Sequence, residues 1–194
     1  MTEDRSIAAS EADPLTFEQL RSIDMGPYLY FVPSSLGILS VFDDLKYDRA
    51  DADMLSPAMR QHAIKTLGRL GFRQKSGTVL EHRGSATRCL IPKFHALGAS
   101  PFDITRYTAR GERDFYLLTP TQTACAFVDT SPLDEAVAQI GALVARQPIN
   151  LYRLMDYLER KPAHKDFMKA IGHLKYLQRM AVESEPLRRR RALG

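Results

Sequence analysis

The sequence predicts an α+β fold: a central antiparallel sheet with an N-terminal mixed region and C-terminal helices. Short segments rich in β-branched and aromatic residues, each bounded by turn residues, occupy much of the chain between residues 78 and 129. Segments with apolar residues at helical spacing follow between residues 131 and 182. Because no helix is predicted between the strands to form parallel crossovers, we expect the sheet to be antiparallel.

The first 55 residues predict a mixed region. Residues 1–14 are acidic and polar, and we expect a flexible leader there. Phe17, Leu20 and Ile23 lie at helical spacing and predict a short helix, which a Gly-Pro pair ends. The segments that follow predict a strand over 28–32, a strand or a short helix over 36–42, and an acidic loop over 43–53.

The clearest helix of the first half is predicted over residues 56–70. Ser56 suits the N-cap, because its hydroxyl oxygen accepts a backbone N–H, and Pro57 suits the first helical position. Gly71 suits the left-handed position after the helix. Apolar side chains recur along this segment at spacings of three and four, at Met59, Ala63, Ile64, Leu67 and Leu70.

Five short strands are predicted after this helix. Turn sequences that contain Gly, Ser or Pro separate most of them. The last two are expected to form a hairpin around Pro120-Thr121. The predicted strands cover residues 78–82, 87–92, 104–108, 115–119 and 123–129.

Three helices are predicted in the C-terminal part. Ser131-Pro132 begins the first, Asn150 caps the second and Pro162 opens the third. One compact unit is expected rather than two independent domains. Its predicted parts are the leader over 1–14, a mixed core over 15–130, a helical part over 131–186 packed on that core, and a basic tail over 187–194.

Composition and the first residues narrow the class of protein. The chain has 194 residues, of which 44% are hydrophobic and 26% charged, as is usual for a globular protein. Residues 1–14 lack the features of a secretory signal, and no apolar stretch is long enough to span a membrane. We therefore expect a cytoplasmic protein with no membrane partner, in which Cys89 and Cys125 are buried thiols. The two cysteines could pair only if neighbouring strands carried them.

Charge is distributed unevenly along the chain. Residues 1–60 carry a net charge of −6 and residues 61–194 a net charge of +10, which gives the overall value of +4. Within residues 60–113, 11 Lys and Arg stand against 3 Asp and Glu, and Arg188 to Arg191 close the basic part. Such asymmetry predicts either a polyanionic partner or an acidic segment, here 43–53, that masks the basic region.

The leading hypothesis is a non-enzymatic protein that binds DNA or RNA through a basic face, as a regulatory or accessory factor. Lys and Arg side chains that neutralise phosphates release condensed counterions and so supply affinity. The middle of the chain offers one group of candidates, and the helical end offers a second group with the lengths of a helix-turn-helix. The predicted nucleic-acid-binding residues are Arg69, Arg73, Lys75, Arg83 and Arg88 in the middle, and Lys165, Lys169 and Arg179 at the helical end.

Two alternatives remain open at this stage. The first is a protein-interaction module, such as an adaptor, a chaperone or an inhibitor, which uses the acidic first 60 residues or the helical end. The second is a metal-dependent nuclease, in which strand carboxylates hold a cation and a base activates water. Its candidate residues are Glu81, Asp103, Asp114 and Asp129, with Lys93 or Arg83 nearby.

No established catalytic or cofactor motif occurs in the sequence. There is no glycine-rich phosphate loop, no Gly-x-Ser-x-Gly turn and no zinc-ligand spacing of Cys and His. We therefore assign no catalytic residue, metal ligand or cofactor, and the sequence leaves the oligomeric state open.

Overall fold

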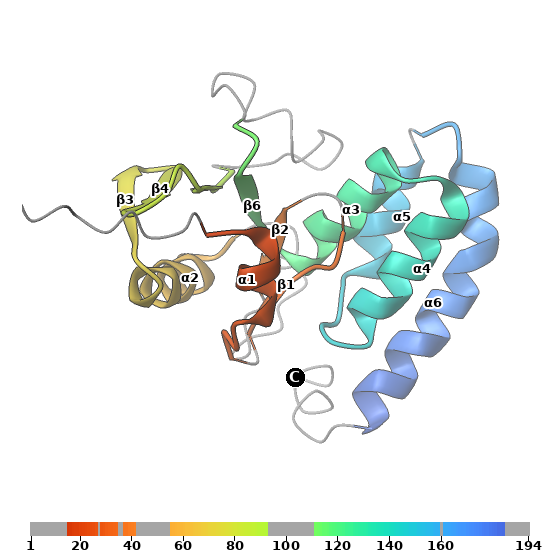
Figure 1. Ribbon diagram of the computed structural model, residues 1–194. Coiled ribbons are helices and arrows are strands. Elements are labelled where there is room, and N and C mark those ends of the chain that lie inside the picture. The colour runs from red at the N-terminus through yellow and green to blue at the C-terminus, as the bar shows by residue number, and fades with distance from the viewer. Residues whose placement is uncertain are drawn as a thin grey trace, which may run out of the picture.

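A six-stranded mixed sheet with helices on both faces forms the centre of the protein (Figure 1). The computed structural model describes residues 15–26, 28–34, 37–41, 55–92, 111–159 and 161–184. The α+β class and the C-terminal helices predicted from the sequence are confirmed. The leader over 1–14, the acidic loop over 43–53, the strand over 104–108 and the tail over 187–194 lie outside the described residues.

The strand order in the sheet is β1-β2-β6-β5-β4-β3. The strands are β1 (Leu29–Phe31), β2 (Ile38–Val41), β3 (Phe72–Ser76), β4 (Val79–His82), β5 (Arg88–Leu90) and β6 (Asp114–Leu118). Adjacent strands in the β1–β2 and β3–β4–β5 segments are antiparallel. The central strand β6 is parallel to both of its neighbours, β2 and β5.

The prediction of a purely antiparallel sheet is therefore wrong at its centre. It assumed that parallel pairs need a helix between consecutive strands. The chain instead reaches β6 from β2 by way of a helix and three strands, and from β5 by the long connection over 91–113. Either path is longer than the dozen residues that a parallel crossover needs.

Six helices lie among the described residues. They are α1 (Phe17–Ser22), α2 (Pro57–Arg69), α3 (Pro120–Thr130), α4 (Leu133–Val144), α5 (Leu151–Leu158) and α6 (His164–Ser184). The predicted caps Ser56 and Asn150 accept hydrogen bonds from the backbone N–H groups of Met59 and Arg153. Ser131 does not cap α4, whose N-cap is Pro132. The segment over 36–42, left open between strand and helix, contains strand β2.

Two apolar cores lie on opposite faces of the sheet. Alternate residues of a strand point to opposite faces, so Phe115 and Leu117 of β6 face one core and Tyr116 and Leu118 face the other. The first core packs against α1 and α2, and the second packs against α3 to α6. The predicted boundary near residue 130 between core and helical part stays a prediction.

Helix α3 replaces a predicted strand. The segment over 123–129 was expected to form a hairpin with 115–119, but it belongs to α3, which starts directly after β6. Thr119 caps this helix and accepts from the backbone N–H of Gln122, while the Gln122 side chain accepts from the Thr119 N–H. This capping box, with Pro120 in the first turn, ends the strand and begins the helix.

Strand β3 was not predicted. Only Phe72 of its five residues is buried, and the other four are exposed. A strand at the edge of a sheet with such a polar sequence has no alternation of apolar residues to mark it. Its charged side chains also protect the open edge from pairing with another chain.

The two cysteines are buried and are not joined in a disulfide. Cys89 lies on β5 and packs with the first core, whereas Cys125 lies on α3 and packs with the second. Burial raises the pKa of the Cys89 thiol. In the part of the chain that the structure describes, no helix is long and apolar enough to cross a membrane.

Candidate functional site

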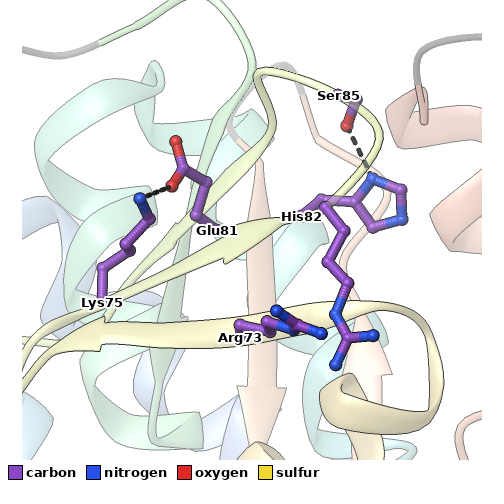
Figure 2. A pocket seen from close by; sticks show the side chains of 6 residues that line it. Arg73, Lys75, Glu81, His82 and Ser85 are labelled. Carbon is purple, nitrogen blue, oxygen red and sulfur yellow. Dashed lines mark hydrogen bonds and ion pairs between the residues drawn. The ribbon is translucent and has the colours of Figure 1, made fainter. Parts of the chain in front are cut away.

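An open hollow of about 440 Å³ lies on the β3–β4 pair and on the turn that follows β4 (Figure 2). Three cationic side chains, one carboxylate, one imidazole and one hydroxyl line it. They belong to Arg73, Lys75, Arg83, Glu81, His82 and Ser85. Three of the residues predicted to bind nucleic acid are therefore brought together by the fold.

Gly71 sets the geometry of one end of the hollow. Its φ of +92° lies in the left-handed region, which lets the chain pass from α2 directly into β3. A Cβ at this position would lie 2.8 Å from Nε2 of His82. The Arg83 N–H donates to the Gly71 carbonyl over 3.2 Å and so ties the end of β4 to the start of β3.

A row of alternating charges crosses four strands beside the hollow. Arg73 on β3 is opposite Glu81 on β4, Glu81 is opposite Arg88 on β5, and Arg88 is opposite Asp114 on β6. We call these four residues the charge row. Their position in the strand alternation places them on the sheet face toward α3 to α6, because Arg88 and Asp114 alternate in phase with Leu90 and Tyr116 of that core.

The inner end of the charge row is buried. Asp114 is 1% exposed and accepts from Arg88 twice, from Nε over 2.8 Å and from Nη2 over 2.5 Å. It also accepts from the Gly111 N–H over 2.6 Å. The hydrogen bond to Asp114 raises the pKa of Arg88 against the effect of burial, and the nearby charges of Asp114 and Glu81 raise it further.

The outer end of the charge row, Arg73 on β3, is exposed, and Glu81 beside it forms an ion pair with Lys75, which is not part of the row. Lys75 Nζ lies 2.9 Å from a carboxylate oxygen of Glu81, and the two side chains are 67% and 37% exposed. Figure 2 shows this pair on one side of the hollow and Arg73 below it. The residues that line the hollow thus include one carboxylate and three cations, which leaves an excess of positive charge.

Hydrogen bonds hold the other side of the hollow. His82 Nδ1 lies 2.9 Å from Ser85 Oγ, and Ser85 Oγ donates to Thr87 Oγ1 over 3.0 Å. The His82 ring also contacts Phe72 edge-on, at 5.2 Å between ring centroids. His82 and Glu81 are consecutive on β4, so their side chains leave the strand on opposite faces. Glu81 and His82 therefore do not leave β4 toward a common reacting atom.

Two other residues predicted to bind nucleic acid, Arg88 and Arg69, do not line the hollow. Arg88 belongs to the charge row and is held by Asp114. Arg69 is exposed in the last turn of α2, where a cation complements the helix dipole, and it is not among the residues that line the hollow.

The three predicted residues of the helical end form a separate group on α6. Lys165, Lys169 and Arg179 are all exposed. Lys169 pairs with Asp166 at 3.0 Å, and Arg179 pairs with Glu183 at 2.8 Å. Figure 1 shows α6 on the far side of the helical part from β3 and β4. The two predicted groups therefore do not form one continuous face.

The carboxylates considered for a nuclease do not converge in the part of the chain that the structure describes. Asp114 accepts hydrogen bonds from Arg88 and from the Gly111 N–H. Asp129 accepts a hydrogen bond from the Tyr157 hydroxyl and pairs with Lys161 at 2.8 Å. Among described residues, no three side chains of His, Cys, Asp or Glu come together to hold a metal ion. Asp103 and Lys93 lie outside the described residues.

A second surface feature lies on the outer side of α5 and α6. Tyr152, Tyr176 and Met180 are 59%, 58% and 47% exposed, and they are the large apolar side chains that stand out on the described surface. Lys175 Nζ lies 5.3 Å from the centre of the Tyr152 ring. We call these three apolar residues the aromatic patch. Exposed Tyr and Met are typical of protein interfaces.

No protein-family model matches this chain, and comparison with curated proteins and with solved structures finds no match either.

Proposed function

We propose that the protein binds nucleic acid through the hollow, with Arg73, Lys75 and Arg83 contacting phosphates. The observation that carries this proposal is the convergence of three cationic side chains around one open surface that contains a single carboxylate. A non-enzymatic regulatory or accessory role fits such a surface and stays a prediction.

The chemistry of the lining suits phosphate. Arg73 and Arg83 each present a planar guanidinium, which donates two parallel hydrogen bonds to phosphate oxygens. Lys75 adds a mobile point charge, and Ser85 adds a hydroxyl. These groups read charge rather than base identity, so we expect affinity with little sequence preference.

Neutralising the hollow tests this proposal. In the variant Arg73→Gln/Lys75→Gln/Arg83→Gln we expect affinity for a short fluorescein-labelled oligonucleotide to fall at least tenfold at low salt. Because each phosphate contact releases counterions, the slope of log K against log salt should also become flatter by roughly 2 to 3 between about 50 and 200 mM salt. Fluorescence anisotropy with RNA and DNA measures both quantities.

A matched variant separates the hollow from net charge. Lys165→Gln/Lys169→Gln/Arg179→Gln removes the same charge from α6, and we expect it to keep most of the affinity. If both variants lose the same affinity for the oligonucleotide, overall charge and not the hollow accounts for the binding, which would contradict a site at the hollow. Absence of binding by the unaltered protein at low salt would end the proposal.

A second candidate function, interaction with another protein, is favoured by the aromatic patch. Aromatic and Met side chains at the centre of an interface, with charged residues at the rim, are the usual pattern of such surfaces. On α6 the patch is flanked by Lys175 and Arg179. A partner with acidic residues around an apolar centre would fit this surface.

Removing the aromatic patch tests the second function. We expect Tyr152→Ser/Tyr176→Ser to abolish any complex that survives nuclease treatment, because exposed aromatic anchors supply most of the affinity of such interfaces. Pull-down followed by titration of the identified partner measures the loss. The variant Arg73→Gln/Lys75→Gln/Arg83→Gln is the control and should keep the complex. If both variants bind the partner equally well, the aromatic patch is not the binding site.

A further inference from the structure

We infer that Glu81 is the specificity-determining residue of the hollow. Its carboxylate occupies the place of an anionic ligand, so that ligands with several adjacent phosphate groups bind much more tightly than a single small anion. This inference rests on the proposed function, since it names the class of ligand that the same hollow accepts.

Glu81 has one cation in contact and two cationic residues as neighbours in the strand register. Lys75 Nζ lies 2.9 Å from its carboxylate, and the residues opposite Glu81 in the strand register are Arg73 on β3 and Arg88 on β5. Because Glu81 and Arg88 are opposite each other on neighbouring strands, the charge of Glu81 adds to the effect of Asp114 in raising the pKa of Arg88. A carboxylate among cations is where a phosphate group would otherwise lie.

The ion pair of Lys75 with Glu81 and the ion pair of Arg88 with Asp114 differ in how easily they exchange partners. The pair of Lys75 and Glu81 is exposed, and exposed ion pairs of this kind are weak. The pair of Arg88 and Asp114 is held by two hydrogen bonds on a carboxylate that is 1% exposed. A ligand can therefore draw Lys75 away from Glu81, whereas Arg88 stays in place beside it.

This arrangement selects for ligand charge. An anion that forms an ion pair with Lys75 in place of Glu81 lies next to the Glu81 carboxylate. Like charges at short range repel each other. A single phosphate makes too few contacts to offset that repulsion. A ligand with several phosphates contacts Arg73, Lys75 and Arg83 together, and the added contacts exceed the repulsion from one carboxylate.

Removing the charge of Glu81 should therefore weaken the preference for ligands with several phosphates over a single phosphate. We expect Glu81→Gln to raise the affinity for inorganic phosphate about fivefold or more. The affinity for tripolyphosphate should rise by a smaller factor, so that the ratio of the two affinities falls. Isothermal titration calorimetry with these two probes, and anisotropy with the labelled oligonucleotide, give the ratios directly.

Three further variants serve as controls for the effect of Glu81→Gln. Glu81→Asp keeps the charge and should keep the discrimination against inorganic phosphate, whereas Glu81→Ala should lose it as Glu81→Gln does. Asp166→Asn removes a carboxylate from a Lys pair on α6 and should leave both affinities unchanged. A thermal melt of each variant verifies folding, and the ratio of affinities is insensitive to a loss of folded fraction.

The outcomes distinguish the two proposals. If Glu81→Gln binds both phosphate probes with the ratio of the unaltered protein, or binds them more weakly, the role of Glu81 is overturned. If the ratio falls as expected but no form binds the oligonucleotide, the role of Glu81 stands and nucleic acid is excluded as the ligand. If the oligonucleotide binds through the hollow with an unchanged ratio, the function stands and the inference fails.

Discussion

Phe115→Ala should lower the free energy of unfolding by about 3 to 5 kcal/mol, the largest effect that we expect of any single substitution. Phe115 is fully buried in the first core. Its ring centroid lies 5.6 Å from that of Phe31 on β1 and 5.6 Å from that of Phe72 on β3. One side chain thus connects both edge strands through the centre of the sheet, and its loss leaves a cavity that neither neighbour can fill.

Urea denaturation followed by circular dichroism measures this change. The midpoint should fall without a change in the slope of free energy against urea, since the same surface is exposed on unfolding. Tyr176→Ala on α6 is the control, because an exposed side chain should contribute no more than about 0.5 kcal/mol. A loss below about 1 kcal/mol for Phe115→Ala would contradict the packing described for the first core.

Asp114→Ala should lower the free energy of unfolding by about 3 kcal/mol. The substitution removes the carboxylate that accepts from Arg88 and from the Gly111 N–H, and it leaves the partly buried Arg88 cation without that acceptor. The expected loss lies at the lower end of the range for broken buried pairs, because the Arg88 side chain is 29% exposed and keeps some contact with water. Urea denaturation is again the measurement.

A double variant identifies the cause of that loss. In Arg88→Met/Asp114→Asn the positive charge of Arg88 is absent, and the Asn oxygen at position 114 can still accept from the Gly111 N–H. Because replacing both members of a buried pair costs far less than removing one, the double variant should come within about 1.5 kcal/mol of the unaltered protein. Equal stability of Asp114→Ala and the double variant would show that the charge is not the cause.

Helices with a polar face could be predicted from the sequence, and the buried helix could not. Helix α2 shows its cap and its apolar stripe directly in the sequence. Helix α3 is buried from Pro120 to Phe127, so it has no polar face and no helical periodicity over that length. Its one sequence signal is Thr119-Pro120 with Gln122 at the third helical position, which was interpreted as a hairpin turn.

The parallel pairing at the centre of the sheet could not be predicted either, for a different reason. Strands β2 and β6 pair in parallel although Ile38 and Tyr116 are far apart in sequence. Local turn residues carry information about hairpins and none about such distant pairs. The antiparallel segments, which neighbouring strands form, are the ones that turn residues could predict.

The candidate site was predicted in part. Arg73, Lys75 and Arg83 are a short way apart in the sequence, and the β3–β4 pair brings them together. The opposition of Arg73 and Glu81 depends on strand register, which includes an irregularity between Gln74 and Ser76 that the sequence does not show. The position of Ser85 three residues after His82, across a Gly-containing turn, is the signal by which the other side of the hollow could have been found.

The central position of β6 bears on how the chain folds during synthesis. The segments β1–β2 and β3–β4–β5 are paired within themselves, and β6 is the strand that joins them. Until the ribosome has released residue 118, β2 and β5 each have an open edge, and open edges invite pairing with other chains. Closing such distant contacts is slow compared with forming hairpins. We therefore expect the nascent protein to be most prone to aggregation before β6 is available to join the two segments of the sheet.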